Sequence, residues 1–213
     1  MAQVLIGGRI ATTADPLRCA VFISGSGSGL EALLRFQQHD CQHTTCVVVS
    51  NKENAGGLNH AEAYGIPSVV IPHTGADGER LAREEHEQLI IDQLQPYGVE
   101  LIVLSGYMLL LSPTFIHQYS PSIVNIHPSL LPKFPGAHAH RDVLQSNETM
   151  TGCTVHLVDE GMDSGQILGQ CRVPIFQDDS EFTLSERVKV EEHRLYPAIL
   201  TKIANGEILG EDG

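Results

Sequence analysis

An amide and an imidazole stand two positions apart at the end of a predicted strand. Asn125 and His127 belong to the run Val124–Pro132, which reads VNIHPSLLP. Residues i and i+2 of a strand project from the same face, so these two side chains should point the same way. Pro128 removes a backbone donor and ends the strand there. An amide can donate to a developing oxyanion and an imidazole can act as acid, base or charged donor, so the pair suits acyl transfer. A histidine satisfied within the core is the alternative interpretation.

A carboxylate that could orient this imidazole lies further along the chain. The acidic segment Asp159–Gln166 reads DEGMDSGQ and falls between two predicted strands. Asp159 and Glu160 fit a solvated hairpin loop. Asp163 differs from them because the Ser-Gly that follows lets the backbone bend sharply and aim a short carboxylate inward. There it could orient or charge an imidazole as a third group.

A glycine-rich turn forms a candidate phosphate site. Residues Ser24–Gly29 read SGSGSG directly after a predicted strand and directly before a predicted helix. Backbone N–H groups and hydroxyls in such a turn can surround a phosphate at the positive end of the helix. The turn lacks the P-loop lysine, and Ser50-Asn51-Lys52 stands where a dinucleotide site has its ribose-binding acid, so a monophosphate is favoured. A tight turn that binds nothing is the alternative.

Composition and charge argue against several classes of partner. The 213 residues include 13 Lys+Arg and 26 Asp+Glu, for a formal net charge of −13, and 42% of them are hydrophobic. A charge of this sign repels phosphate backbones and anionic surfaces, so neither nucleic acid nor membrane is expected as a partner. No apolar stretch reaches about 18 residues, the length that spans a bilayer. The five cysteines are odd in number and form no CxxC pair, which predicts a reducing, cytoplasmic setting.

The elements that must position these groups follow an alternating pattern. Short β-branched runs alternate with segments of helical period, which predicts an α/β fold with a mostly parallel twisted sheet and helices on both faces. We expect residues 1–17 to be an N-terminal extension and residues 18–213 to form a single domain. The predicted strands are Cys19–Ser24, Thr45–Ser50, Ser68–Ile71, Leu101–Ser105, Ser122–Ile126, Thr154–Val158 and Ile167–Pro174, and the predicted helices are Gly29–Gln38, Leu58–Tyr64, Gly78–Leu94, Pro113–His117, His138–Ser146 and Thr183–Asn205.

Six motifs in order give the chain a resemblance to a known family. From Arg18 to about Leu209 it resembles the phosphoribosylglycinamide formyltransferases (glycinamide ribonucleotide transformylases), which are folate-dependent formyltransferases. The run around Asn125 is shared with methionyl-tRNA formyltransferase and formyltetrahydrofolate deformylase, whereas the length, the glycine-rich turn and the ERVKVEEH segment select the purine-pathway enzyme. The motifs are FISGSGSGLEALL, VVVSNKENAGGLNHAEAYGIP, LIVLSGYMLLLSP, VNIHPSLLPKFPGAHAH, TGCTVHLVDEGMDSGQIL and TLSERVKVEEHRLYP.

The resemblance implies a Rossmann-like formyltransferase fold and a specific reaction. A formyl group would pass from the co-substrate 10-formyltetrahydrofolate to the amine of glycinamide ribonucleotide in de novo purine (IMP) biosynthesis, without a metal and in a monomer or homodimer. The implied catalytic residues are Asn125, His127 and Asp163. Asn125 would donate to the formyl oxygen, and His127, held and charged by Asp163 through water, would stabilise the tetrahedral oxyanion. Proton movement from the amine to the folate nitrogen would use His127 and an ordered water.

Two binding regions are implied in the same way. Gly27, Ser28 and Gly29 match the phosphate site together with Lys189, and Glu192 matches the residue that holds the ribose or glycinamide end. Lys189 and Glu192 are three positions apart and so share a helix face. Ordinary surface charges or a local ion pair are the alternative for these two. The residues that match the folate site are Tyr107, Met108, Leu109, Leu110, Leu111, Asn125, Val158, Asp159 and Asp163.

Two residues depart from the family's pattern. Gly29 stands where the family commonly has Asn, so one side-chain contact near the phosphate is absent while the backbone donor is kept. Leu109 stands where the family has Arg, a cation near the carboxylate tail of the folate. Both changes bear on substrate affinity and leave the transfer chemistry intact.

Three other interpretations use some of these residues. A related hydrolase that releases formate would keep the three catalytic residues, but Lys189, Glu192 and the glycine-rich turn argue for an acceptor site. A metal enzyme could use His138 and His140, although side chains two positions apart on a helix point about 200° away from each other. A nucleotide-binding module without catalysis would leave the Asn, His and Asp set unexplained.

Overall fold

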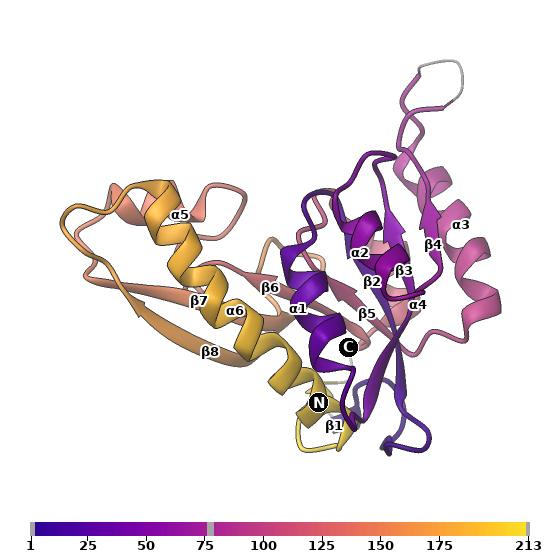
Figure 1. The fold of residues 1–213 in the computed structure, drawn as a ribbon. Helices are drawn as coiled ribbons and strands as arrows, with labels where there is room; N and C mark the ends of the chain where they lie inside the picture. The colour runs from indigo at the N-terminus through magenta and orange to yellow at the C-terminus, as the bar shows by residue number, and fades with distance from the viewer. Residues whose placement is uncertain (1–2, 76–78, 212–213) are drawn as a thin grey trace.

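The centre of the molecule is a seven-stranded sheet (Figure 1). The computed structural model describes residues 3–75 and 79–211. In the order given below, the first five strands run parallel, and the sixth pairs antiparallel with both the fifth and the seventh. The predicted mostly parallel α/β fold is confirmed. Across the sheet the strands are β4 (Ser68–Val70), β3 (His43–Ser50), β2 (Leu17–Ile23), β5 (Leu101–Leu104), β6 (Ile123–His127), β7 (Met150–Leu157) and β8 (Ile167–Pro174).

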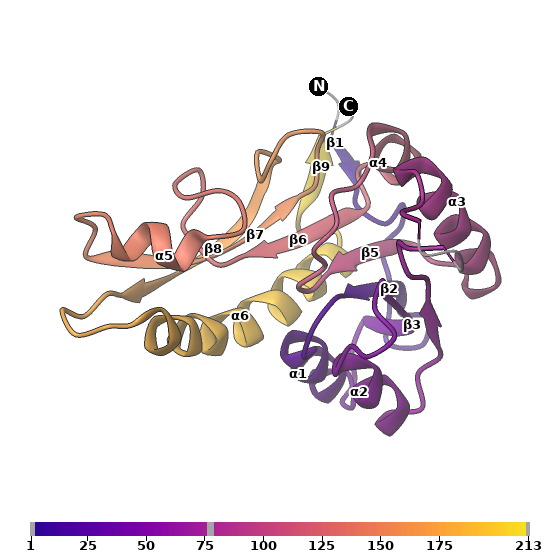
Figure 2. The same ribbon diagram turned by 90° about the horizontal axis from the view of Figure 1, so that it is seen from above.

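Helices cover both faces of this sheet, as Figure 2 shows. Successive residues such as Val21 and Phe22 are fully buried because one faces each helical layer. Within the described part of the chain, no helix combines the length and the apolar character needed to cross a membrane. One face carries α1 (Ser28–Phe36), α2 (Gly57–Ala63) and α6 (Glu181–Ala204), with α5 (Ala139–Leu144) beside α6, and the other carries α3 (Arg83–Leu94), a 3₁₀ turn (Gln95–Tyr97) and α4 (Pro113–Tyr119).

Helix α3 is shorter than the sequence predicts. The expected helix over 78–94 begins at Arg83, and residue 78 lies outside the described residues. Ala82, just before the helix, has an extended ψ of 147°, and Thr74 and Arg80 form an isolated antiparallel bridge. This pairing keeps the chain extended up to Ala82, so a helical period in the sequence was overridden by a local contact.

The segment before β2 packs against the body of the protein. β1 (Gln3–Leu5) pairs antiparallel with β9 (Leu209–Glu211), so the two ends of the described chain lie together (Figure 1). Ile6 is fully buried, and the guanidinium of Arg9 forms an ion pair with Glu100. Neither short strand is predicted from the sequence, because three residues carry too little periodicity to identify one.

Candidate active site

His127 stands at the carboxyl end of β6 with both ring nitrogens engaged. Its side chain is buried, with Nδ1 3.3 Å from Oδ2 of Asp163 and Nε2 2.8 Å from the carbonyl oxygen of Phe134. The Phe134 carbonyl accepts from the ring, and the Asp163 carboxylate lies within ion-pair distance of its other nitrogen. The contact with Asp163 is direct, whereas the sequence analysis expected a water between the two groups. The strand end therefore sets a buried imidazole beside a carboxylate.

Asp163 reaches His127 because of an unusual backbone conformation. Its φ is 53°, in the left-handed region that Asp tolerates better than most side chains. Oδ2 accepts a hydrogen bond of 2.7 Å from the backbone N–H of Gly136, and Oδ1 lies 3.6 Å from Nε2 of His156. His156, the Gly136 N–H and His127 outweigh burial and hold the pKa of Asp163 down to about 2. A carboxylate that stays ionised near neutral pH thus faces the His127 ring.

His156 is the member of this cluster that sequence reasoning missed. It is buried on β7, directly opposite Asn125 in the antiparallel β6–β7 pair. Its Nδ1 lies 2.7 Å from the Leu157 carbonyl, so Nδ1 carries a proton, and its Nε2 is 3.2 Å from Nδ2 of Asn125. One ionisable residue in the mostly apolar run TVHLV was the available signal, but nothing local revealed which strand residue it would face. His156 joins the Asn125 amide to the Asp163 carboxylate.

The glycine-rich turn closes tightly over the start of α1. Gly27 has a φ of 75°, and a Cβ at this position would lie 2.4 Å from the Cα of Gly57. Only glycine satisfies both constraints. The turn borders a cavity of about 330 Å³, here called the glycine-loop cavity, which collects the whole predicted phosphate site. Its lining includes Gly25, Ser26, Gly27, Ser28, Gly29, Ser105, His140, Lys189, Glu192 and His193.

Two charged residues of α6 face the glycine loop across this cavity. The Tyr196 hydroxyl lies 3.0 Å from the carbonyl oxygens of Leu104 and Val124, which ties α6 to the sheet at this level. Lys189 forms an ion pair with a neighbouring glutamate on the same helix. Burial raises the pKa of Glu192 to about 7, and Lys189 opposes that shift. Near pH 7 the cavity therefore combines an ammonium group with a partly protonated carboxyl, which lowers the barrier to an incoming anion.

The two histidines of the H-x-H motif separate. His140 lines the glycine-loop cavity, where burial and then the charge of Lys189 lower its pKa, whereas His138 is exposed. Among the residues that the structure describes, no group of three His, Cys, Asp or Glu side chains could hold a metal ion. The motif contributes one residue to the cavity rather than a pair of ligands.

A second cavity, of about 360 Å³, opens on the other face of β6 and is mostly apolar. We call it the leucine-loop cavity, after the segment 109–111 that forms one wall. It contains nearly all residues of the predicted folate region, but Met108 lies in the lining of the glycine-loop cavity, with 69% of the residue exposed. The leucine-loop lining includes Leu104, Tyr107, Leu109, Leu110, Leu111, Ile116, Asn125, His156, Val158, Asp159 and Asp163.

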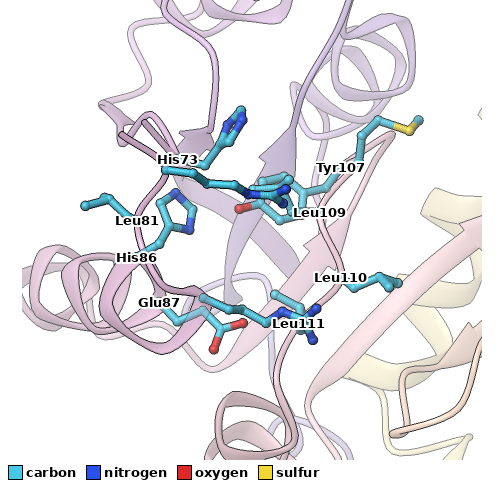
Figure 3. Close-up of a pocket in the computed structure, with 11 residues that line it drawn as sticks. His73, Leu81, His86, Glu87, Tyr107, Leu109, Leu110 and Leu111 are labelled. Atoms are coloured by element: carbon cyan, nitrogen blue, oxygen red, sulfur yellow. The ribbon is translucent and has the colours of Figure 1, made fainter. Parts of the chain in front are cut away.

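The leucine loop also borders a third cavity, of about 460 Å³, against α3 (Figure 3). The figure shows His86 and Glu87 of α3 across from the loop. Glu87 accepts a 2.7 Å hydrogen bond from the backbone N–H of Ser112, which fixes the end of the loop. Arg83 lines both this cavity and the leucine-loop cavity. A cation that the sequence analysis did not consider therefore stands close to Leu109.

Comparison with known proteins shows which family the chain belongs to. A family model described as formyl transferase matches residues 17–200. The chain belongs to the formyl transferase family. A phosphoribosylglycinamide formyltransferase of Escherichia coli (strain K12) is 36% identical over 193 residues, which are 90% of this chain and 89% of the relative.

Other formyl transferases extend the comparison. A trifunctional purine biosynthetic protein adenosine-3 of Gallus gallus is 44% identical over 210 residues, and the match covers 98% of this chain but 20% of that protein. The chain thus spans about a fifth of the length of this relative. The crystal structure of a phosphoribosylglycinamide formyltransferase from Brucella melitensis superposes with a TM-score of 0.83 at 44% identity, covering 92% of this chain and 100% of that one.

Proposed function

We propose that this formyl transferase moves the formyl group of 10-formyltetrahydrofolate to the amine of glycinamide ribonucleotide, a step of de novo purine biosynthesis. The observation that carries the proposal is the position of Asn125, His127 and Asp163 at the end of β6, a strand that contributes to the walls of two cavities. Asn125 and Asp163 line the leucine-loop cavity, while Ile126 and Pro128 line the glycine-loop cavity. A transferase must bring a donor and an acceptor to one set of reacting groups, and neighbouring residues at the end of β6 line the two cavities.

The glycine-loop cavity suits the ribonucleotide. Backbone N–H groups at the start of α1 can bind its phosphate, and Lys189 adds a positive charge from α6. Glu192 can accept from the ribose or glycinamide end, three positions further along the same helix. Such a local site is what a chain of net charge −13 needs in order to bind an anion.

The leucine-loop cavity fits the formyl-folate. Its leucine side chains offer apolar walls to a flat ring system, and the backbone around Val158 and Asp159 offers polar groups to the edge of that ring. When bound, the folate supplies an activated one-carbon acyl group. Tyr107 and Leu109–Leu111 would hold it with its formyl end toward Asn125.

The residues at the end of β6 would act on the charges that develop during transfer. Attack by the amine places negative charge on the formyl oxygen and positive charge on the nitrogen. Asn125 donates to this oxygen, and the cationic His127 ring stabilises it by redirecting the N–H that otherwise bonds the Phe134 carbonyl. Asp163 orients the ring and maintains its charge. The proton lost by the amine reaches the folate nitrogen by way of His127 and solvent.

The proposal also covers the setting of the enzyme. We infer that the domain from Arg18 onward carries both cavities. The segment before it is joined to that domain by the pairing of β1 with β9. The protein would work in the cytoplasm as a monomer or homodimer. Cys19, Cys41, Cys46, Cys153 and Cys171 are all free thiols, which supports a reducing compartment.

One assay separates the proposed reaction from its competitors. The purified chain is given 10-formyltetrahydrofolate with and without glycinamide ribonucleotide, and both the formylated product and free formate are measured, with and without a chelator. We expect ribonucleotide-dependent product, little formate and no effect of the chelator. Release of formate without use of the ribonucleotide would instead identify a hydrolase, and a loss of turnover with chelator would identify a metal enzyme.

A further inference from the structure

Ser105 and Gly29 form a close contact at the floor of the glycine-loop cavity. Ser105 directly follows β5, and Gly29 is the second residue of α1. A Cβ added to Gly29 would lie 2.5 Å from Oγ of Ser105 but 3.9 Å from its Cβ. The φ of Gly29 lies outside the left-handed region, so the backbone does not require glycine there. The hydroxyl of Ser105 occupies the space that any side chain at position 29 would need.

The Ser105 hydroxyl is free to bind something else. Within the described residues it makes no hydrogen bond, and Oγ is not among the buried unpartnered atoms, so it is open to the cavity that Ser105 lines. The residue itself is held in place, because its backbone N–H donates a 2.9 Å hydrogen bond to the carbonyl of Phe22. A fixed serine therefore presents an unused donor next to Gly29, in the wall of the cavity that Ser28 and Gly29 also line.

We propose that Ser105 is a further phosphate-binding residue, whose Oγ–H donates to a phosphate oxygen of the acceptor nucleotide. This inference rests on the proposed function and adds to it a residue from a different strand. A phosphate has several oxygens to satisfy, and a hydroxyl on the cavity wall complements the loop amides and Lys189. The side-chain contact that is absent at Gly29 is thereby supplied from the end of β5, and glycine at position 29 is what makes room for it.

Four variants test the assignment by moving one hydroxyl across the contact. Ser105→Ala removes the donor. Gly29→Ala pushes a methyl group against Oγ and displaces it. The double variant Gly29→Ala/Ser105→Ala relieves that clash, because the two Cβ atoms would lie 3.9 Å apart, but it has no hydroxyl. Gly29→Ser/Ser105→Ala has the same two Cβ atoms as the preceding variant and returns a hydroxyl group from position 29.

Two measurements are made on each variant in the full chain. The first is the KM for glycinamide ribonucleotide, compared with kcat and with the KM for the folate. The second is the binding of inorganic phosphate by titration calorimetry, which does not depend on turnover. Ser185→Ala is the matched control, because its hydroxyl bonds the Phe182 carbonyl at 2.9 Å and lines neither substrate cavity. Thermal unfolding checks that every variant folds.

We expect Ser105→Ala to raise the KM for the ribonucleotide about tenfold and to weaken phosphate binding by a similar factor, with kcat and the folate KM nearly unchanged. Gly29→Ala/Ser105→Ala should behave like Ser105→Ala, and Gly29→Ser/Ser105→Ala should recover most of the affinity.

Three results would separate the possible failures. If Ser105→Ala matches Ser185→Ala in both measurements while the wild type formylates the ribonucleotide, Ser105 does not bind phosphate. If the alanine and serine double variants bind phosphate equally, packing rather than the hydroxyl governs the site, and the assignment is wrong. A wild type that shows no formyl transfer contradicts the proposed function, and the calorimetric comparison still decides the role of Ser105.

Discussion

The two cavities lie on opposite faces of β6 and are built from different parts of the chain. The glycine-loop cavity takes most of its polar lining from one continuous turn and from one helix, α6. The leucine-loop cavity draws on β5 and the loop after it, on β6, on β7 and the loop after it, and on residues of α3 and α4, and leucine side chains form one of its walls. A charged group can be held by a few local backbone donors, whereas a flat apolar ligand needs surfaces from several parts of the chain. The difference explains why the first site is visible as a motif and the second is not.

Two carboxylates show the same contrast in their titration. Glu192 in the glycine-loop cavity has a pKa raised to about 7 by burial, while the pKa of Asp163 is held down to about 2 by His156, the Gly136 N–H and His127. The same chemical group is thus made easy to protonate on one side of β6 and hard to protonate on the other. Variants on each side should therefore change different quantities.

The largest effect is expected at the pair formed by Asp163 and His127. Asp163→Asn keeps the shape of the side chain but removes the charge that faces His127 at 3.3 Å. We expect kcat to fall by roughly 10²-fold or more, the scale of lost acid–base or oxyanion stabilisation, while both KM values change little. Steady-state kinetics with each substrate varied in turn provides the measurement. A near-normal kcat would contradict the assigned mechanism and leave the family membership unaffected.

Combining this change with His127→Ala shows whether the cluster acts as a unit. Residues that act together in one step do not have additive effects. The double variant should therefore be little slower than the worse of the two single variants. Independent, multiplying losses in kcat would mean that Asp163 does not act through His127.

Glu192→Gln tests the glycine-loop cavity through the pH dependence of the free energy of unfolding. Between pH 4.5 and about 7 the unfolded chain loses this proton while the folded chain keeps it, so the free energy of unfolding falls as the pH rises through that window. Above pH 7 the buried carboxylate is ionised and its full cost is present. Removing the charge should raise the free energy of unfolding at pH 8 by about 1–3 kcal/mol and have less effect at pH 5. Urea unfolding at both pH values, with exposed Glu62→Gln as control, measures this. An equal change at the two pH values would show that burial does not govern Glu192.

Lys189→Ala should weaken the polar site without changing the chemistry. Its ammonium group is a cation on the helix face opposite the glycine loop. We expect the KM for the ribonucleotide to rise about fivefold to tenfold, more than kcat falls, with a dependence on salt that is smaller than in the wild type. Lys202→Ala, on the same helix but outside both cavities, is the control. An unchanged KM would remove Lys189 from the phosphate site.

The smallest effect is expected in the leucine-loop cavity. Leu109→Arg adds a cation to the leucine loop, and an exposed ion pair with the folate's carboxylate tail is worth up to about 1 kcal/mol. The KM for polyglutamylated folate should fall by up to about fivefold relative to the monoglutamate. Arg83 already lines this cavity, so the same comparison with Arg83→Gln is informative. If the wild type already discriminates strongly between polyglutamylated and monoglutamate folate, and Arg83→Gln abolishes that difference, then Arg83 rather than residue 109 binds the carboxylate tail.

The sequence by itself determined the order along the chain of the strands of the central sheet and of helices α1 to α6, the shared face of Asn125 and His127, and the glycine-rich turn before α1. Each of these depends on neighbours within a few residues: alternation along a strand, a run of glycines before a helix, and an i, i+3 pair on α6. The helix expected over 78–94 shows the limit of such reasoning, because a bridge between Thr74 and Arg80 delayed its start to Arg83.

Tertiary structure decided the contacts between segments that are distant in the chain. The antiparallel register of β6 and β7 set His156 opposite Asn125, and the φ of 53° at Asp163 brought its carboxylate directly to His127. The approach of β5 to α1 placed Ser105 where a side chain at Gly29 would stand. Strand register and helix packing are fixed by burial over the whole sheet, so no local pattern could predict which of these groups would meet.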